Sequence, residues 1–307
     1  MSAVYFDAAL DDAARRERLQ RGDLFVYAPT ASTRALCAFA RGLIEAAFAP
    51  LDPRTAQFEL PLLEFHPAVA GLKRDLPAHP GTTEHLRQIV AAMGCAPDAT
   101  YFHPPYFRTP TSAGYLNLLG RPPYDLDPHR DTWAAAPPCQ ITWWIPLYDL
   151  VAENTLAIHP DYWQRPVRNG SADFDYRERA GAETAKRVLA AVANGTRRGP
   201  YVEEPVDREL AIEVVCQAGG LIMFSSAHLH STVPNTSGAT RYSLDFRTVH
   251  LDDLRERRGP PHVDAAYTGT NLLGFRRVSD QAPVPEDLIA MYDVFAPNTV
   301  SRGESRG

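Results

Sequence analysis

The sequence has few cysteines, no long apolar run and no excess of basic residues. Its four cysteines stand far apart and form no CxxC pair. They therefore predict neither a disulfide framework nor a zinc ribbon, but reduced thiols in a cytoplasmic protein. No apolar stretch approaches the roughly 20 residues that span a bilayer, and the first residues lack the apolar core of a secretory signal. A net charge of −6 argues against a nucleic-acid partner.

The composition is that of an ordinary globular protein that is rich in proline. Hydrophobic residues make up 45% of the 307 residues and charged residues 22%, which is enough apolar side chain for a sizeable core. Proline (27) outnumbers glycine (19). Because proline interrupts helices, this balance favours a loop-rich, β-heavy body with short helices around it.

The hydrophobic period changes near residue 98. Apolar residues at three- and four-residue steps predict amphipathic helices over 31–49, capped by Ser32 or Thr33 and stopped by Pro50, and over 82–94. A helical insertion is expected around 177–194 and a last helix at 285–295. β-branched and aromatic runs predict strands at 99–103, 112–119, 139–148, 155–159, 212–216, 220–224, 226–231 and 239–249.

Many short strands between Gly/Pro turns predict a sandwich or barrel rather than two independent domains. The expected organisation is one domain over 1–307. Within it, 1–97 form an N-terminal helical buttress, 98–250 a β core with a helical insertion near 160–200, and 251–307 C-terminal loops and a helix.

The sharpest local motif is the His-x-Asp pair formed by His129 and Asp131. At a strand end, side chains two residues apart project to the same face. An imidazole and a carboxylate there supply two of the three ligands of a divalent metal site. A structural hydrogen bond between the two is the alternative.

A second motif lies about a hundred residues further on. A strand carries His230 into a turn, and the next strand returns with Arg241 and Ser243 on one face. A guanidinium fork beside a hydroxyl suits one end of a dicarboxylate. His228, two residues before His230, is the rival ligand and is otherwise expected to line the pocket or support a ligand.

Together these motifs resemble the iron(II)/2-oxoglutarate-dependent oxygenases. The His-x-Asp pair, the distant His and the Arg-x-Ser that follows are most similar to the phytanoyl-CoA dioxygenase-like branch. The Ser-x-x-Pro-Asn-Thr-Ser-Gly turn at 231–238 and the segment 140–160 add to the likeness, which covers roughly 100–250.

The resemblance implies a mainly β fold with flanking helices and a double-stranded β-helix (jelly-roll, cupin-like) core. It implies that His129, Asp131 and His230 bind iron(II), leaving open positions for the cosubstrate 2-oxoglutarate and for O2. Arg241 would then pair with the C5 carboxylate of 2-oxoglutarate, assisted by Ser243 or Thr232.

The activity so implied is that of a dioxygenase, an oxidoreductase that hydroxylates an unactivated C–H bond of a small molecule and releases succinate and CO2. An amino acid or a biosynthetic natural-product intermediate is the expected substrate class. Halogenating relatives carry a small residue in place of the carboxylate, so Asp131 favours hydroxylation or another oxidation over halogenation.

Other polar residues on the predicted strands have two interpretations. Asn117, Gln140 and Thr142 either contact the C1 end of 2-oxoglutarate or substrate, or form core hydrogen bonds. Asp245 and Arg247 are expected to form an internal ion pair. The alternative functions are a cupin-like metal-dependent enzyme that does not use 2-oxoglutarate, and a catalytically inactive ligand-binding β-helix protein. The sequence specifies neither substrate nor oligomeric state.

Overall fold

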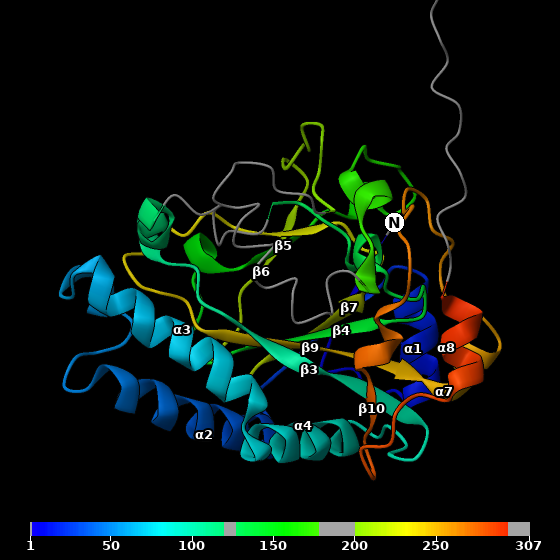
Figure 1. Ribbon diagram of the computed structural model, residues 1–307, viewed down its shortest axis with the longest axis horizontal. Coiled ribbons are helices and arrows are strands. Elements are labelled where there is room, and N and C mark those ends of the chain that lie inside the picture. Colours follow the sequence, from blue (N-terminus) through cyan, green and yellow to red (C-terminus); the bar gives the residue numbers. More distant parts are fainter. Residues whose placement is uncertain (1, 120–126, 178–199, 294–307) are drawn as a thin grey trace, which may run out of the picture.

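A seven-stranded sheet forms the centre of the molecule (Figure 1). The computed structural model describes residues 2–119, 127–177 and 200–293. The strand order is β1-β2-β7-β4-β9-β3-β10, and all neighbours are antiparallel except β1 and β2. The strands are β1 (Val4–Phe6), β2 (Leu24–Tyr27), β3 (Thr100–Arg108), β4 (Ile141–Pro146), β7 (Leu221–Ser225), β9 (Ser243–His250) and β10 (Arg276–Arg277).

A smaller antiparallel sheet faces the large one. Its order is β6-β5-β8, made of β5 (Leu156–Ile158), β6 (Ile212–Val214) and β8 (His230–Thr232). His129 adds one more position beyond β8, because it forms an isolated antiparallel bridge with His230. Apolar side chains from both sheets, among them Trp144, Phe224 and Leu156, fill the space between them.

The path of the chain identifies the fold. The chain leaves β3 of the large sheet, reaches the small sheet at the His129 bridge and returns to the large sheet at β4. It then forms β5 and β6 of the small sheet, β7 of the large sheet, β8 of the small sheet and finally β9 of the large sheet. Two antiparallel sheets joined by strands that alternate in this way form a double-stranded β-helix. The expected fold class, mainly β with flanking helices, is therefore confirmed.

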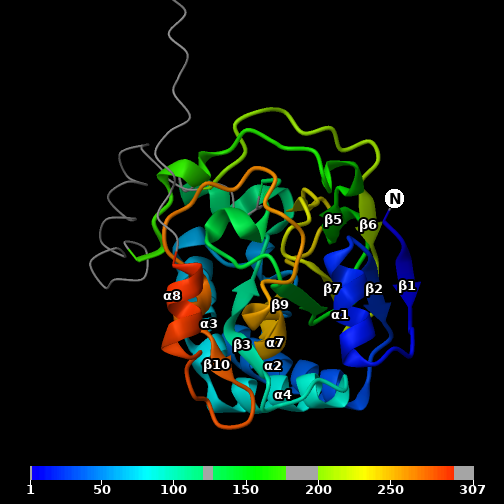
Figure 2. The same ribbon diagram turned by 90° about the vertical axis from the view of Figure 1, so that its right-hand side faces the viewer.

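Strand alternation sends successive side chains of β4 to opposite faces of the large sheet. Trp144 lies between the sheets, whereas Trp143 faces the opposite cluster, where the helices pack. Helices α2, α3 and α4 cover that outer face (Figure 1), and Figure 2 places β1 and β10 at opposite edges of the large sheet. The helices are α1 (Asp12–Gln20), α2 (Ala31–Phe48), α3 (Leu62–Ala78), α4 (Pro80–Ala92), α7 (Leu251–Arg255) and α8 (Glu286–Tyr292).

Local sequence explains the helix ends. Thr30, rather than Ser32 or Thr33, caps α2: its hydroxyl accepts from the Thr33 amide, while the Thr33 hydroxyl accepts from the Thr30 amide. The helix ends before Pro50 as predicted. The helices predicted at 82–94 and 285–295 correspond to α4 and α8.

Three expectations for the secondary structure need comment. The N-terminal region contributes β1 and β2 to the large sheet as well as helices. The strand predicted at 112–119 is wrong, because this segment forms the 3-10 helix η2 (Ser112–Leu119) with Ala113 at a φ of 51°. The insertion predicted at 177–194 lies outside the described residues, apart from Arg177.

No helix in the described part of the chain is long and apolar enough to cross a membrane. The remaining short helices are η1 (Ala56–Phe58), η3 (Asp131–Ala134), η4 (Ala152–Asn154), η5 (Pro160–Tyr162), η6 (Gly170–Asp173) and η7 (Asn271–Gly274).

Candidate metal centre

The structure brings His129, Asp131 and His230 together. One ligand atom from each lies within 4.8 Å of the others. His129 and His230 exchange two backbone hydrogen bonds of 2.9 Å, and their ring centroids lie 4.2 Å apart. Asp131 begins η3 immediately afterwards. The bridge between the small sheet's edge and the His-x-Asp segment thus brings three metal-ligating groups into one cluster.

Backbone carbonyls fix the tautomer of both imidazoles. Nδ1 of His129 lies 2.9 Å from the Asp127 carbonyl oxygen, and Nδ1 of His230 lies 3.0 Å from that of His228. A carbonyl oxygen only accepts, so each Nδ1 carries the proton and each Nε2 carries a lone pair. Metal-binding histidines are commonly oriented by such a bond, and this donor set fits a divalent metal.

Electrostatics keeps the three groups in the protonation states that a metal requires. Burial lowers the pKa of His230 to about 3, and it also lowers that of His129, although Asp131 opposes this shift. Burial raises the pKa of Asp131, but Arg247 and the two histidines lower it more, so the net shift is downward. At neutral pH the site therefore holds two neutral imidazoles and one carboxylate.

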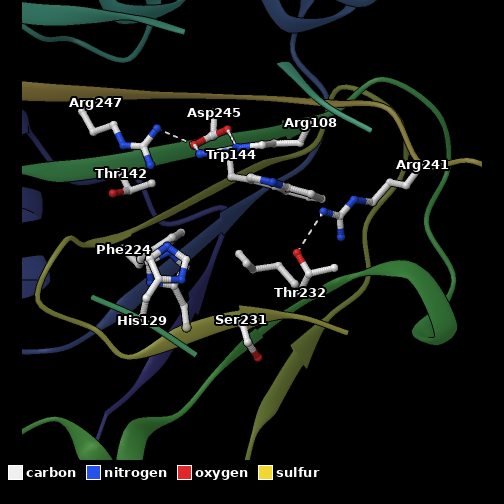
Figure 3. Close-up of a pocket in the computed structure, with 12 residues that line it drawn as sticks. Arg108, His129, Thr142, Trp144, Phe224, Ser231, Thr232, Arg241, Asp245 and Arg247 are labelled. Carbon is white, nitrogen blue, oxygen red and sulfur yellow. Dashed lines mark hydrogen bonds and ion pairs between the residues drawn. The ribbon is translucent and has the colours of Figure 1, made fainter. Parts of the chain in front are cut away.

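Two of the three groups, His129 and His230, line a pocket between the two sheets (Figure 3), and Asp131 lies behind its wall, in contact with the lining residues Thr142 and Arg247. Figure 3 shows His129, Thr142 and Arg247 toward one side and Arg241 with Thr232 toward the other, with Trp144 between them. The pocket is lined by Arg108, His129, Thr142, Trp144, Leu156, Phe224, His230, Ser231, Thr232, Arg241, Asp245 and Arg247.

Arg241 brings a buried positive charge to the far end of this pocket. Its Nη1 donates to the carbonyls of Asn154 and Thr155 at 2.9 Å, and its Nη2 donates to Thr232 Oγ1 at 3.3 Å. The guanidinium carbon lies 5.3 Å from the centroid of the Trp144 ring. These contacts hold the guanidinium in one orientation, as recognition of an anion requires.

Ser243 is a buried hydroxyl without a hydrogen-bond partner in the described structure. It lies on β9 two and four residues before Asp245 and Arg247, which line the pocket, so strand alternation places its side chain on the same face. A buried hydroxyl without a partner is costly, and an acceptor supplied by a ligand removes that cost.

Two of the remaining candidates have clear contacts. Thr142 lines the pocket and donates to Asp131 Oδ2 at 2.7 Å. Gln140 is not a lining residue; its amide nitrogen donates to Ser226 Oγ and its amide oxygen accepts from Asn271, both at 2.7 Å. The geometry thus favours the core hydrogen-bond interpretation for Gln140. The side chain of Asn117 lies outside the described part of the structure.

His228 does not line the pocket. It is fully buried, its Nε2 lies 3.0 Å from the Gly22 carbonyl oxygen, and its ring centroid lies 4.5 Å from that of Trp163. The turn before β8 breaks the strand alternation, so residues 228 and 230 point to different places. The His228 side chain therefore does not line the pocket, although the His228 backbone carbonyl accepts from His230 Nδ1.

The sequence did not predict that Arg247 contacts the candidate metal ligand Asp131. As expected, Arg247 forms an ion pair with Asp245. It also donates from Nη2 to Asp131 Oδ1 at 3.1 Å and from Nε to Asp131 Oδ2 at 3.2 Å. Arg108 adds a further pair to Asp245 at 2.8 Å. The polar and charged residues at every second position from 241 to 247 were the available signal.

Comparison with known proteins gives matches among solved structures only; no family model and no curated protein matches the chain. One similar structure is EvdO2 from Micromonospora carbonacea var. aurantiaca (15% identity, 80% of this chain and 93% of that chain, TM-score 0.46). Another is HygX from Streptomyces hygroscopicus with nickel and 2-oxoglutarate bound (13% identity, 84% and 97%, TM-score 0.44). The fold assignment rests on this chain's own strand order, and its chemistry on the side chains of the pocket.

Proposed function

We propose that this protein is an iron(II)- and 2-oxoglutarate-dependent oxygenase that oxidises a small molecule. The observation that carries the proposal is one pocket lined by His129 and His230, whose ligand atoms cluster with that of Asp131, and by the Arg241 guanidinium toward the other side. Two imidazoles and a carboxylate with open positions are typical of non-haem iron(II) oxygenases. A buried guanidinium beside hydroxyls fits the distal carboxylate of a dicarboxylate cosubstrate.

In this proposal His129, Asp131 and His230 would hold the iron, and three protein ligands would leave positions open for a cosubstrate and O2. When bound, iron(II) together with 2-oxoglutarate supplies O2-dependent oxidation of a C–H bond, with release of succinate and CO2. The Nδ1 hydrogen bonds of His129 and His230 keep both rings from rotating. This restraint lowers the cost of assembling the site around the metal.

Arg241 would bind the C5 carboxylate, and Thr232 and Ser243 would add hydroxyl donors to it. Thr232 already accepts from Arg241, so its own proton is available for a ligand oxygen. Trp144, Leu156 and Phe224 supply apolar wall between the two ends. These side chains exclude water along the length of the cosubstrate, which strengthens each charged contact inside the pocket.

Hydroxylation is the proposed outcome, because Asp131 occupies the position that a halide would need. Desaturation, cyclisation and epimerisation use the same donors and differ in how the substrate lies over them. An amino acid or a natural-product intermediate is the proposed substrate class.

The test is an anaerobic titration of metal-free protein with iron(II) and then 2-oxoglutarate, followed by visible absorption. We expect the weak charge-transfer band of a chelated 2-keto acid, and succinate formation when air is admitted. Bound iron without this band would instead indicate a cupin-like enzyme that does not use 2-oxoglutarate. Absence of iron binding would leave the ligand-binding β-helix protein.

Metal binding is also expected to stabilise the fold. At a metal concentration of about 100 times Kd the stabilisation is about 2.7 kcal/mol, which corresponds to a rise in Tm of about 5 °C. The measurement is thermal unfolding with Mn(II), followed by chelator to reverse the shift. Asp131→Asn, which keeps the side-chain shape but removes the charge, should show no rise; an equal rise in that variant would place the metal elsewhere.

A further inference from the structure

The hydrogen bonds on Asp131 single out one of its two oxygens. Oδ2 accepts from Thr142 Oγ1 at 2.7 Å and from Arg247 Nε at 3.2 Å, whereas Oδ1 accepts from Arg247 Nη2 at 3.1 Å. A carboxylate offers about four lone-pair positions, two on each oxygen. Three of the four are therefore used by these donors, and the fourth lies on Oδ1.

Oδ1 is also the oxygen nearest to the first imidazole. It lies 3.9 Å from His129 Nε2, the ring atom that carries the lone pair. The remaining lone pair of Asp131 is thus on the oxygen beside the other metal donors. A carboxylate restrained in this way binds a metal through one oxygen, because its second oxygen already accepts two hydrogen bonds.

Arg247 is itself held by a chain of buried charges. Its Nη1 donates to Asp245, whose carboxylate accepts from Arg108 Nε at 2.8 Å and from Arg108 Nη2 at 3.3 Å. Arg247 is 6% exposed and Asp245 4% exposed. The Tyr106 ring centroid lies 4.8 Å from the guanidinium carbons of both arginines. The Arg247 guanidinium is hydrogen-bonded to Asp245 on one side and to Asp131 on the other, so its plane cannot rotate freely.

We propose that Arg247 is a positioning residue that restricts Asp131 to one-oxygen coordination through Oδ1 and so keeps a coordination position open. The inference rests on the proposed function, since it assigns a role toward the metal. Bidentate binding by Asp131 would fill a fourth position of a six-coordinate ion. Arg247 prevents this by occupying both oxygens at once, which a single ammonium group does not do.

The experiment measures Mn(II) binding and the number of metal-bound waters, from broadening of the Mn(II) electron paramagnetic resonance lines in 17O-enriched water. Wild type should bind Mn(II) with about three waters. In Arg247→Met the second oxygen of Asp131 is freed from Arg247 and can also bind the metal. We therefore expect about two metal-bound waters and a Kd for Mn(II) raised by about 10- to 100-fold. Arg247→Lys should fall between the two, and Thr142→Val should raise Kd by less than Arg247→Met.

The matched control is Arg16→Met. Arg16 pairs with the buried Asp253 and is not a pocket residue, so its loss tests general destabilisation. Wild-type affinity and water number in Arg247→Met would overturn the inference, as would an equal loss of affinity in Arg16→Met. If Arg247→Met does not fold, the test depends on Arg247→Lys and Thr142→Val. The inference is overturned if both of these variants keep the wild-type Mn(II) affinity and the wild-type number of metal-bound waters.

The outcomes also separate the inference from the proposed function. Wild type that binds no Mn(II) overturns both. A second outcome is possible. Wild type and the variants bind Mn(II) as expected, but the protein neither binds nor consumes 2-oxoglutarate. That result overturns only the proposed cosubstrate and supports the role of Arg247.

Discussion

His230→Ala is expected to abolish metal binding and, with it, O2-dependent consumption of 2-oxoglutarate. Losing a hydrogen bond to a metal ligand costs about 10- to 100-fold in affinity, and losing the ligand itself should cost more. His230 is 5% exposed, and its bridge to His129 also aligns the second imidazole. The bridge uses backbone atoms only, so alanine retains it and removes the donor alone. Mn(II) titration and iron analysis of the purified variant measure the effect.

His228→Ala is the matched control. It removes a histidine of the same turn that contacts the Gly22 carbonyl and Trp163 but lies outside the pocket. We expect a lower Tm with metal affinity close to that of wild type. If His228→Ala loses the metal and His230→Ala retains it, the ligand assignment is reversed and the proposed site is wrong.

The candidate ligands could be predicted from sequence because the information is local. His129 and Asp131 stand two residues apart, and His230 precedes Arg241 and Ser243 at a spacing that resembles a known family. The double-stranded β-helix followed from the same resemblance together with the strand pattern. Helix α2 followed from its apolar spacing, although the cap lies at Thr30.

The hydrogen bonds from Thr142 and Arg247 that hold Asp131 could not be predicted in this way, because they depend on the register between two strands. Arg247 reaches Asp131 since β9 pairs with β4 so that Arg247 stands opposite Thr142. Both side chains then meet the same carboxylate. A shift by one residue would turn Arg247 to the helical face, and nothing in the sequence alone fixes that register.

Local backbone conformation explains the errors. The apolar run at 112–119 has strand-like composition, yet Ala113 and Gly114 adopt positive φ and turn the chain into η2. Likewise the turn before β8 separates His228 from His230, although strand alternation would place them on one face. In both segments the backbone departs from the regular strand on which the expectation was based.

Arg241→Met is expected to raise the Kd for 2-oxoglutarate by about 100-fold or more. Removing one partner of a buried charge pair costs about 2–5 kcal/mol, because the other charge is left unpaired. The measurement compares 2-oxoglutarate with 2-oxopentanoate, which has the same keto-acid end but lacks the second carboxylate. Wild type should prefer 2-oxoglutarate strongly, and Arg241→Met should lose that preference. An unchanged preference would show that the guanidinium does not bind the carboxylate.

Ser243→Ala separates ligand binding from stability at the same end of the pocket. Its hydroxyl has no hydrogen-bond partner in the described structure, so alanine removes an unpaired buried polar group and should leave Tm unchanged or slightly higher. Loss of a hydrogen bond to the cosubstrate carboxylate should raise the Kd for 2-oxoglutarate by about 10-fold. Thr248→Val is the control on the same strand, because Thr248 accepts from Trp143 Nε1 at 2.8 Å and does not line the pocket. It should lower Tm and leave that Kd unchanged. If Ser243→Ala instead lowers Tm and leaves the Kd unchanged, the hydroxyl serves the core, and the C5 carboxylate depends on Arg241 and Thr232 alone.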